Sequence, residues 1–341
     1  MSIDSIRGTP EHPIMKSLVR RPVAFALWVA CGIAPVFVPV AIRAAEPVAT
    51  ASQTGTPRRV IAADDSKQTL ASIGPSGLVE WKLPVGPIHD LHLLPNGHLL
   101  YQDGWTQVVE VDGDHAQVWK YDAKQGDNAG RPVEVHAFQR LPNGSTMIVE
   151  SGPARIIEVD REGKICKEIK LSVQHPSAHS DTRNARKTEA GTYLVAHERD
   201  GVIREYDATG TVVWEFDVPL FGKAPRGGHG PESFGDQAYS AIRLPSGNTL
   251  IGTGNGHSVL EVNPRKEIVW QLGQHDLPGI ALAWVTQVSR KADGNTVIVN
   301  CHAGPENPQI IEVTPEKQVV WTFRDFTTFG NSMPVAVVLG P

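Results

Sequence analysis

The stretch AYSAIRLPSGNTLIGTGNGHSVLEVNPRKEIVWQLG, residues 238–273, has the pattern of four short strands joined by tight turns. Its apolar and β-branched runs YSAIRL, TLIG, SVLEV and EIVWQL are separated by segments rich in Gly, Pro and Asn. Runs of this kind favour extended backbone, and such breaks favour turns. The stretch therefore predicts a four-stranded antiparallel sheet whose strands follow one another along the chain.

The same unit recurs along the chain. The fourth strand is expected to carry Trp, or once Cys, at one position, and the six positions are Trp81, Trp119, Cys166, Trp214, Trp270 and Trp321. The turn after the first strand recurs at residues 94–97, 141–144, 188–191, 244–247 and 291–294. Because a single sheet cannot bury its own faces, we expect the repeats to pack against one another.

The two ends of the repeat array are incomplete in matching ways. Residues 58–82 supply the last three strands of a unit, whereas residues 331–339 (NSMPVAVVL) resemble a first strand with no unit after it. Pairing these ends closes a ring and removes an exposed sheet edge. We predict an all-β protein, a six-bladed β-propeller of four-stranded antiparallel blades, closed by the C-terminal strand joining the N-terminal blade. An open solenoid is the alternative, but it needs no matched ends.

The N-terminal segment has the composition of an export signal. Lys16, Arg20 and Arg21 precede an apolar run at residues 22–42, and small residues that resemble a cleavage site follow at 49–51. We expect residues 1–55 to be a signal peptide and flexible leader, residues 56–341 to form the propeller, and the protein to be periplasmic or secreted. An uncleaved membrane anchor is the alternative, since the apolar run is about long enough to span a bilayer.

Charge and cysteine content narrow the classes of partner. The formal net charge is −5, which gives no indication of a nucleic-acid partner. Two cysteines follow the leader, Cys166 and Cys301; the repeat places them in blades far apart, so we expect two free thiols without zinc-site spacing. We expect a monomer without a cofactor that meets the membrane only through its signal or anchor.

One position of the repeat carries mostly polar side chains. It lies at the same distance before each first-strand turn, and its occupants are His89, His136, Arg183, Tyr239, Thr286 and Met333. Because the innermost strands of a propeller line its channel, these residues are expected to form a ring at one depth. A purely structural ring would more often be small or apolar.

Most of the histidines fall on one face, where the connections between blades meet the loops between second and third strands. A concave mouth with titratable and aromatic groups is the default place for a site. Histidine exchanges protons near neutral pH, and arginine binds sulfate, phosphate or carboxylate with a planar donor fork. The predicted catalytic residues are His89, His136, His179 and Arg183. The predicted substrate-binding residues are Tyr239, Trp284, His302, Thr286 and Asp181.

Three uses of this face are open. The first is group transfer, hydrolysis or elimination on a small anionic or sugar-like molecule. The second is a non-catalytic propeller that binds a carbohydrate or a protein, with Trp105, Trp284 and Tyr239 stacking on sugar rings. We assign no metal, although one among His89, His136 and His179 is the third alternative. Residues 221–236 (FGKAPRGGHGPESFGD) are an insertion before a first strand, and they form either a functional loop or plain surface.

The unit LPxGNTLI…EVxPxGxVVW resembles the repeats of bacterial PQQ-like propellers and is more similar to the exported arylsulfotransferase-like six-bladed group, over roughly residues 58–339. That resemblance implies sulfate transfer through a channel histidine, helped by further histidines and an arginine; His89, His136, His179 and Arg183 are the positions that could take these roles. The chain has no His-x-Asn pair at an inner-strand start. Quinone-dependent relatives have eight blades, so six blades imply no such cofactor.

Overall fold

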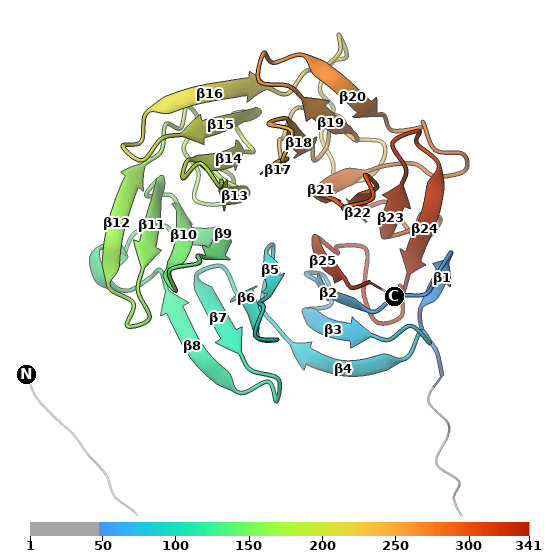
Figure 1. The fold of residues 1–341 in the computed structure, drawn as a ribbon, viewed down its shortest axis with the longest axis horizontal. Helices are drawn as coiled ribbons and strands as arrows, with labels where there is room; N and C mark the ends of the chain where they lie inside the picture. Colours follow the sequence, from blue (N-terminus) through green and yellow to red (C-terminus); the bar gives the residue numbers. More distant parts are fainter. Residues whose placement is uncertain (1–47, 341) are drawn as a thin grey trace, which may run out of the picture. The chain divides into compact units, whose positions relative to one another are not determined.

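The computed structural model describes residues 48–340, which form six sheets around a central axis (Figure 1). The stretch that predicts the repeat forms β17 (Ser240–Arg243), β18 (Thr249–Gly252), β19 (Val259–Val262) and β20 (Ile268–Leu272). These strands pair antiparallel in chain order, as the sequence predicts. We number the blades along the chain, so that this sheet is blade 5.

The other blades repeat this order from the channel outward. Blade 1 contains β25 (Val335–Val338), β2 (Val60–Asp64), β3 (Thr69–Ile73) and β4 (Val79–Pro84). Blade 2 contains β5 (Leu91–Leu93), β6 (Leu99–Asp103), β7 (Gln107–Val111) and β8 (Gln117–Asp122), which the short 3₁₀ turn Gly126–Asn128 follows. Blade 3 contains β9 (Glu134–Arg140), β10 (Thr146–Ser151), β11 (Arg155–Val159) and β12 (Ile165–Lys170). Blade 4 contains β13 (Asn184–Lys187), β14 (Tyr193–His197), β15 (Val202–Tyr206) and β16 (Val212–Asp217). Blade 6 contains β21 (Trp284–Arg290), β22 (Thr296–Cys301), β23 (Ile310–Val313) and β24 (Val319–Arg324).

The predicted closure is confirmed. Strand β25 pairs antiparallel with β2, with Val338 opposite Val60 and Val335 opposite Ala63. One further strand, β1 (Ser52–Thr54), adds to the outer edge of blade 6 beside β24. The folded sheets therefore extend a few residues into the segment that the sequence assigns to the leader. The predicted export signal lies almost wholly in residues 1–47, outside the described part.

Burial follows the position of each strand in its blade. The second strands, such as β10 and β22, are buried along their whole length, because a neighbouring blade covers each face. This explains why they read as continuous apolar runs rather than as alternating ones. The fourth strands, such as β4, alternate between exposed and half-buried residues because they form the outer rim.

A recurring unit of one Glu, one Arg and one Trp joins adjacent blades, and we call it the Glu–Arg–Trp unit. The Glu lies on a third strand opposite the fourth-strand Trp, and an Arg from the next blade pairs with the Glu. Four copies are present among the described residues: Glu110/Arg140/Trp119, Glu205/Arg243/Trp214, Glu261/Arg290/Trp270 and Glu312/Arg58/Trp321. Each guanidinium carbon lies 5.1 to 5.8 Å from the centroid of the indole, a distance at which cation and ring attract.

The interface between blades 3 and 4 differs, and here the predicted register is wrong by one residue. Glu158 lies opposite Lys167, not Cys166, so Lys167 occupies the position of the tryptophan. Cys166 falls at the bulge in this strand and is exposed. The aromatic ring comes instead from Tyr193 of blade 4, whose hydroxyl donates to Glu158. Lys167 and Lys187 each place the ammonium 5.2 Å from that ring centroid.

The insertion at residues 221–236 is held against the propeller by specific contacts. Arg226 and Phe234 form an antiparallel bridge within it. Gln274 Nε2 donates to the carbonyl of Pro231 at 2.7 Å, and both ring nitrogens of the buried His257 face carbonyl oxygens, those of Ala283 and Ser233. The loop is therefore tied to blades 5 and 6.

Two smaller expectations can also be compared with the structure. Cys166 and Cys301 are both free, as predicted. Across residues 48–340 no helix is long and apolar enough to cross a bilayer.

Candidate functional site

The predicted ring lies where the first strands approach the axis. His136 and Thr286 belong to β9 and β21, and Arg183 and Tyr239 immediately precede β13 and β17. His89 lies two residues before β5. Met333 is buried in an apolar cluster with Phe329 and Trp321, so it serves the core. The remaining ring positions surround one cavity or support it.

A cavity of about 240 Å³ opens at the mouth of the channel. Seven of the predicted site residues line it: His89, His179, Arg183, Tyr239, Trp284, Thr286 and His302. Asp65, Trp105, Glu198 and His229 are further members of the lining. The cavity therefore combines one arginine, several imidazoles, two carboxylates and two indoles, and it can hold a small molecule.

His89, His136 and Arg183 meet at three nitrogen atoms. Nδ1 of His89 lies 2.9 Å from Nδ1 of His136, and Nη1 of Arg183 lies 3.2 and 3.4 Å from these two atoms. A hydrogen bond between two imidazole nitrogens needs one proton, so the two rings form a coupled pair. Burial, together with the charge of Arg183, lowers the pKa of His136 to about 4 and that of His89 well below its usual value.

Arg183 is the buried cation of the site. Its Nε donates to Glu198, which sits in the β14–β15 loop, and its guanidinium lies 5.7 Å from the ring of Tyr239. No hydrogen bond joins its Nη2 to another residue in the described part of the chain. Since Arg183 lines the cavity, its donors are available to an anion.

Glu134, His136 and His179 form a second cluster beside this one. Oε2 of Glu134 lies 3.1 Å from Nε2 of His136 and 2.9 Å from Nδ1 of His179. Burial opposes ionisation of Glu134, but the adjacent imidazoles of His136 and His179 lower its pKa to about 2. The sequence prediction missed Glu134, although alternate residues of a strand share a face and Glu134 lies two positions before His136.

Aromatic side chains form two walls of the cavity. The ring of His229, in the insertion, is tilted against those of Trp284 and His302, with centroids 4.9 and 5.2 Å away. In a second aromatic group, Trp105 lies 5.0 Å from His179 and 5.4 Å from His89. Burial, with the neighbouring His229, lowers the pKa of His302 to about 4. His229 shows that the insertion contributes to the mouth, which sequence spacing alone cannot indicate.

Asp181, which the sequence predicts to bind substrate, is not part of the cavity lining. It is almost fully buried, and its carboxylate accepts a hydrogen bond from the backbone of Gly152 at 2.9 Å. That contact ties the loop before β13 to the neighbouring blade. Thr286 lines the cavity as predicted, and its hydroxyl oxygen is buried without a hydrogen-bond partner among the described residues. A ligand that reaches this depth can satisfy that hydroxyl.

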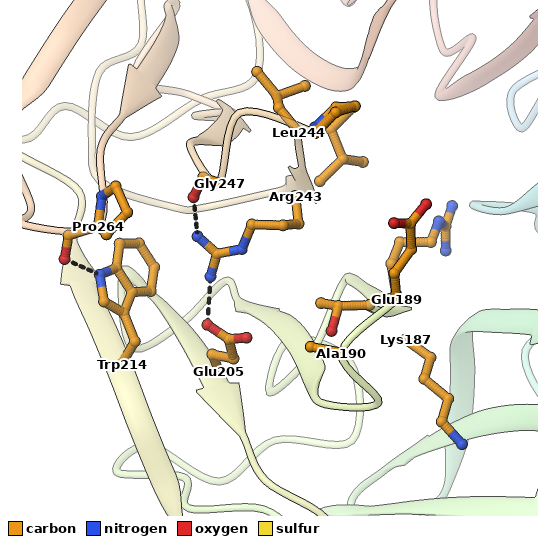
Figure 2. Close-up of a pocket in the computed structure, with 13 residues that line it drawn as sticks. Lys187, Glu189, Ala190, Glu205, Trp214, Arg243, Leu244, Gly247 and Pro264 are labelled. Carbon is orange, nitrogen blue, oxygen red and sulfur yellow. Dashed lines mark hydrogen bonds and ion pairs between the residues drawn. The ribbon is translucent and has the colours of Figure 1, made fainter.

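A larger cavity of about 770 Å³ opens at the opposite end of the propeller, between blades 4 and 5 (Figure 2). Its wall contains one Glu–Arg–Trp unit, in which Arg243 bridges Glu205 and the carbonyl of Gly247, and Trp214 donates to the carbonyl of Pro264. These polar groups satisfy one another. We therefore place the candidate site in the smaller cavity, where polar groups lack partners.

Comparison with solved structures shows the fold. A Bacteroides caccae protein of unknown function superposes with a TM-score of 0.69 at 20% sequence identity, covering 83% of this chain and 99% of that one. Virginiamycin B lyase from Staphylococcus aureus, in a catalytically inactive histidine-to-alanine form with quinupristin, gives 0.52 at 12% identity, covering 80% and 87%. The WD40 β-propeller domain of Doa1 gives 0.50 at 15% identity and 71% of each chain. No protein-family model and no curated protein matches the sequence. At these identities the likeness extends to the propeller fold alone.

Proposed function

We propose that this protein binds a small anionic molecule at the channel mouth and acts on it through His89. The observation that carries the proposal is the placement of Arg183, a buried cation on the cavity wall. Its Nη2 makes no hydrogen bond within residues 48–340, while Nε and Nη1 are held by Glu198 and by the two imidazoles. A donor fixed in this way suits a sulfate, phosphate or carboxylate group.

The pair of imidazoles supports chemistry beyond binding. His89 lines the cavity, and His136 lies behind it, fully buried, at hydrogen-bond distance. A second group that takes or returns the proton of the first is the usual arrangement around a general base or nucleophile. His89 would contact the substrate, and His136 would orient its ring. A propeller neighbour described as a lyase is inactive when one histidine is replaced by alanine, which shows that this fold can support histidine-dependent catalysis.

The indoles suggest the rest of the ligand. Trp105 and Trp284 both line the cavity, and an indole can pack against a ring of the ligand. An aryl or sugar ring bearing an anionic group fits this combination. Sulfate transfer from an aryl sulfate is the most specific form of the proposal. It rests on the resemblance of the repeat to arylsulfotransferase-like propellers. We also propose that the protein is exported to the periplasm or secreted, as its N-terminal sequence predicts.

The test is a thermal-shift and calorimetric titration of purified protein without its leader. Aryl sulfates, phosphate esters, uronic acids and neutral oligosaccharides are compared on wild type, on His89→Asn, and on the double variant Arg183→Met/Glu198→Gln. The double variant removes both charges together, because a lone buried Glu198 carboxylate would be costly. We expect an anionic ligand to raise the melting temperature of wild type by mass action and not that of the double variant.

His89→Asn should bind the ligand and lose turnover, whereas His175→Gln, an exposed histidine at the same face, should behave as wild type. Equal shifts in wild type and the Arg183→Met/Glu198→Gln variant would overturn the anion site. Turnover that survives in His89→Asn would overturn the catalytic role.

A second function is favoured by the indole walls. A non-catalytic propeller that binds a carbohydrate would use Trp105 and Trp284 as stacking faces, and propellers of the WD40 class share the fold. This version predicts saturable binding of neutral oligosaccharides that Trp284→Ala abolishes, with no product formed.

A further inference from the structure

We propose that Glu134, His136 and His179 form a binding site for a divalent transition-metal ion, of which zinc is the representative. Glu134 and His136 lie on β9, and His179 lies in the loop between β12 and β13. The cluster borders the channel-mouth cavity, because His179 is part of the cavity lining. The inference concerns the ion alone and does not depend on the ligand proposed for the cavity.

The spacing of the three side chains fits one ion. The ligating atoms all lie within 4.8 Å of one another, and Oε2 of Glu134 is 3.1 Å from His136 Nε2 and 2.9 Å from His179 Nδ1. Tetrahedral ligands at the bond lengths usual for zinc stand about 3.3 Å apart. Small side-chain movements are therefore enough to coordinate an ion, and no backbone shift is required.

The buried imidazole of His136 gives an independent indication. The residue is completely buried, and its Nε2 forms no well-aligned hydrogen bond with any described residue, although Oε2 of Glu134 is 3.1 Å away. Buried polar atoms of native proteins nearly always have a partner. Its other nitrogen is held by His89, so the ring is oriented from behind in the way that outer contacts orient metal-binding histidines.

The donor set selects the class of ion. Two imidazoles and one carboxylate suit zinc and its neighbours in the first transition row, whereas calcium and magnesium prefer oxygen ligands alone. Three protein ligands leave a position open, which is the composition of catalytic rather than structural zinc sites. Since His179 borders the cavity and contacts Trp105 edge to face with ring centroids 5.0 Å apart, the ion would lie at the edge of the ligand space.

A metal ion in this site would also determine which ring nitrogen of His89 carries the proton. A metal on Nε2 of His136 leaves the proton of that neutral ring on Nδ1, from which it donates to Nδ1 of His89. His89 then carries its own proton on Nε2. Without a metal, a proton on Nε2 of His136 would give His89 the opposite tautomer. The ion would thus decide whether His89 offers a donor or a lone pair.

The test is a titration of chelator-treated protein with Co²⁺, followed by its visible absorption, and with Zn²⁺ by calorimetry. We expect one ion per chain in wild type and binding more than about 100-fold weaker in Glu134→Gln and in His179→Gln. His175→Gln is the matched control, because His175 belongs to the same loop but pairs with Asp200 at 3.1 Å, away from the cluster. This control should bind as tightly as wild type.

Glu134 and His179 are partly exposed, with 20% and 55% of their side-chain surface accessible, so both variants are expected to fold. Circular dichroism and the melting temperature confirm this before titration. Absence of a stoichiometric ion in wild type, or equal affinity in the Glu134→Gln variant, overturns the proposal. Anion binding measured in the presence of chelator separates this outcome from failure of the proposed function.

Discussion

The two ends of the channel are built from the same strands but by different rules. At the end that carries the first-strand turns, the Glu–Arg–Trp unit occurs between four pairs of blades with nearly the same geometry. At the mouth, the ring position holds His, His, Arg, Tyr, Thr and Met. The repeated residues make the contacts that recur between blades. The ring position at the mouth varies from blade to blade, and most of its side chains line one cavity. This variation indicates the site.

The contrast predicts that changes at the repeated end alter stability, whereas changes at the mouth alter binding. The first test of this contrast is Trp321→Ala, in the unit that joins blade 6 to blade 1. Trp321 is completely buried, stacks under Arg58 and donates to the side chain of Gln53 at 3.0 Å. Removing so large a buried ring should lower the free energy of unfolding by about 4 kcal/mol, measured by urea denaturation.

Trp214→Ala is the matched comparison, because Trp214 belongs to the same kind of unit but is only half-buried. Its loss should cost about 1 to 2 kcal/mol, in proportion to the smaller apolar area that it covers. If Trp321→Ala and Trp214→Ala lower the free energy of unfolding by the same amount, the unit that closes the ring is no more stabilising than the others. The comparison between blade interfaces then fails.

Glu205→Gln is expected to have a smaller effect than Trp321→Ala. Glu205 and Arg243 pair across blades 4 and 5 with 14% and 20% of their side chains accessible (Figure 2). Removing the carboxylate leaves the half-buried guanidinium without its charge partner, at a cost of about 2 kcal/mol. The affinity of the mouth for its anion or metal should not change, and a measurable change in that affinity would contradict the separation of the two ends.

The pH dependence of stability provides a third test. Around Glu110 burial opposes ionisation, but His98, Arg140 and Arg161, which lie 2.5 to 2.9 Å from its oxygens, lower its pKa. An unfolded glutamate titrates near pH 4.3. Because the folded pKa is lower, the contribution of Glu110 is fully present above about pH 4.3 and is lost as the pH falls through the folded value.

The urea concentration at the midpoint of unfolding should therefore decrease as the pH falls below about 4.3. Glu110→Gln should lower this midpoint at neutral pH and make it depend less on pH in the acid range. Unfolding curves between pH 3 and 7 check both. Parallel slopes for wild type and Glu110→Gln would mean that other carboxylates dominate the acid response.

Sequence reasoning predicted the fold well because the repeat and its two incomplete ends constrain closure. It missed β1, since Ser52–Thr54 has no apolar pattern and becomes a strand only beside β24. It also shifted blade 3 by one residue: the fourth-strand bulge recurs in the other blades, and the distance from the turn, seven residues from Asp112 to Trp119, places Lys167 rather than Cys166 at this position. Whether β1 forms depends on hydrogen-bond pairing with β24, and only the folded structure supplies that neighbour.

The sequence predicted which residues lie together where they share a strand position. His89, Arg183, Tyr239 and Thr286 line one cavity because equal register in a ring means equal depth. Asp181 and His229 lie in connections, and the direction of a loop side chain depends on contacts such as that with Gly152, which spacing does not encode.

The smallest expected effect concerns the interface between blades 3 and 4, where the aromatic ring has moved from the fourth strand of one blade to the second strand of the next. Tyr193→Thr removes a fully buried ring and should destabilise the protein on its own. Lys167→Trp restores an indole opposite Glu158 and should be tolerated poorly beside Tyr193. Combined, the two changes rebuild the unit found elsewhere, so the double variant should be more stable than the sum of the single losses by about 1 kcal/mol. Urea denaturation of the four proteins measures this coupling. Strict additivity would show that the ring contributes only volume here, and that the paired Glu and Arg or Lys, rather than the indole, are what blades have in common.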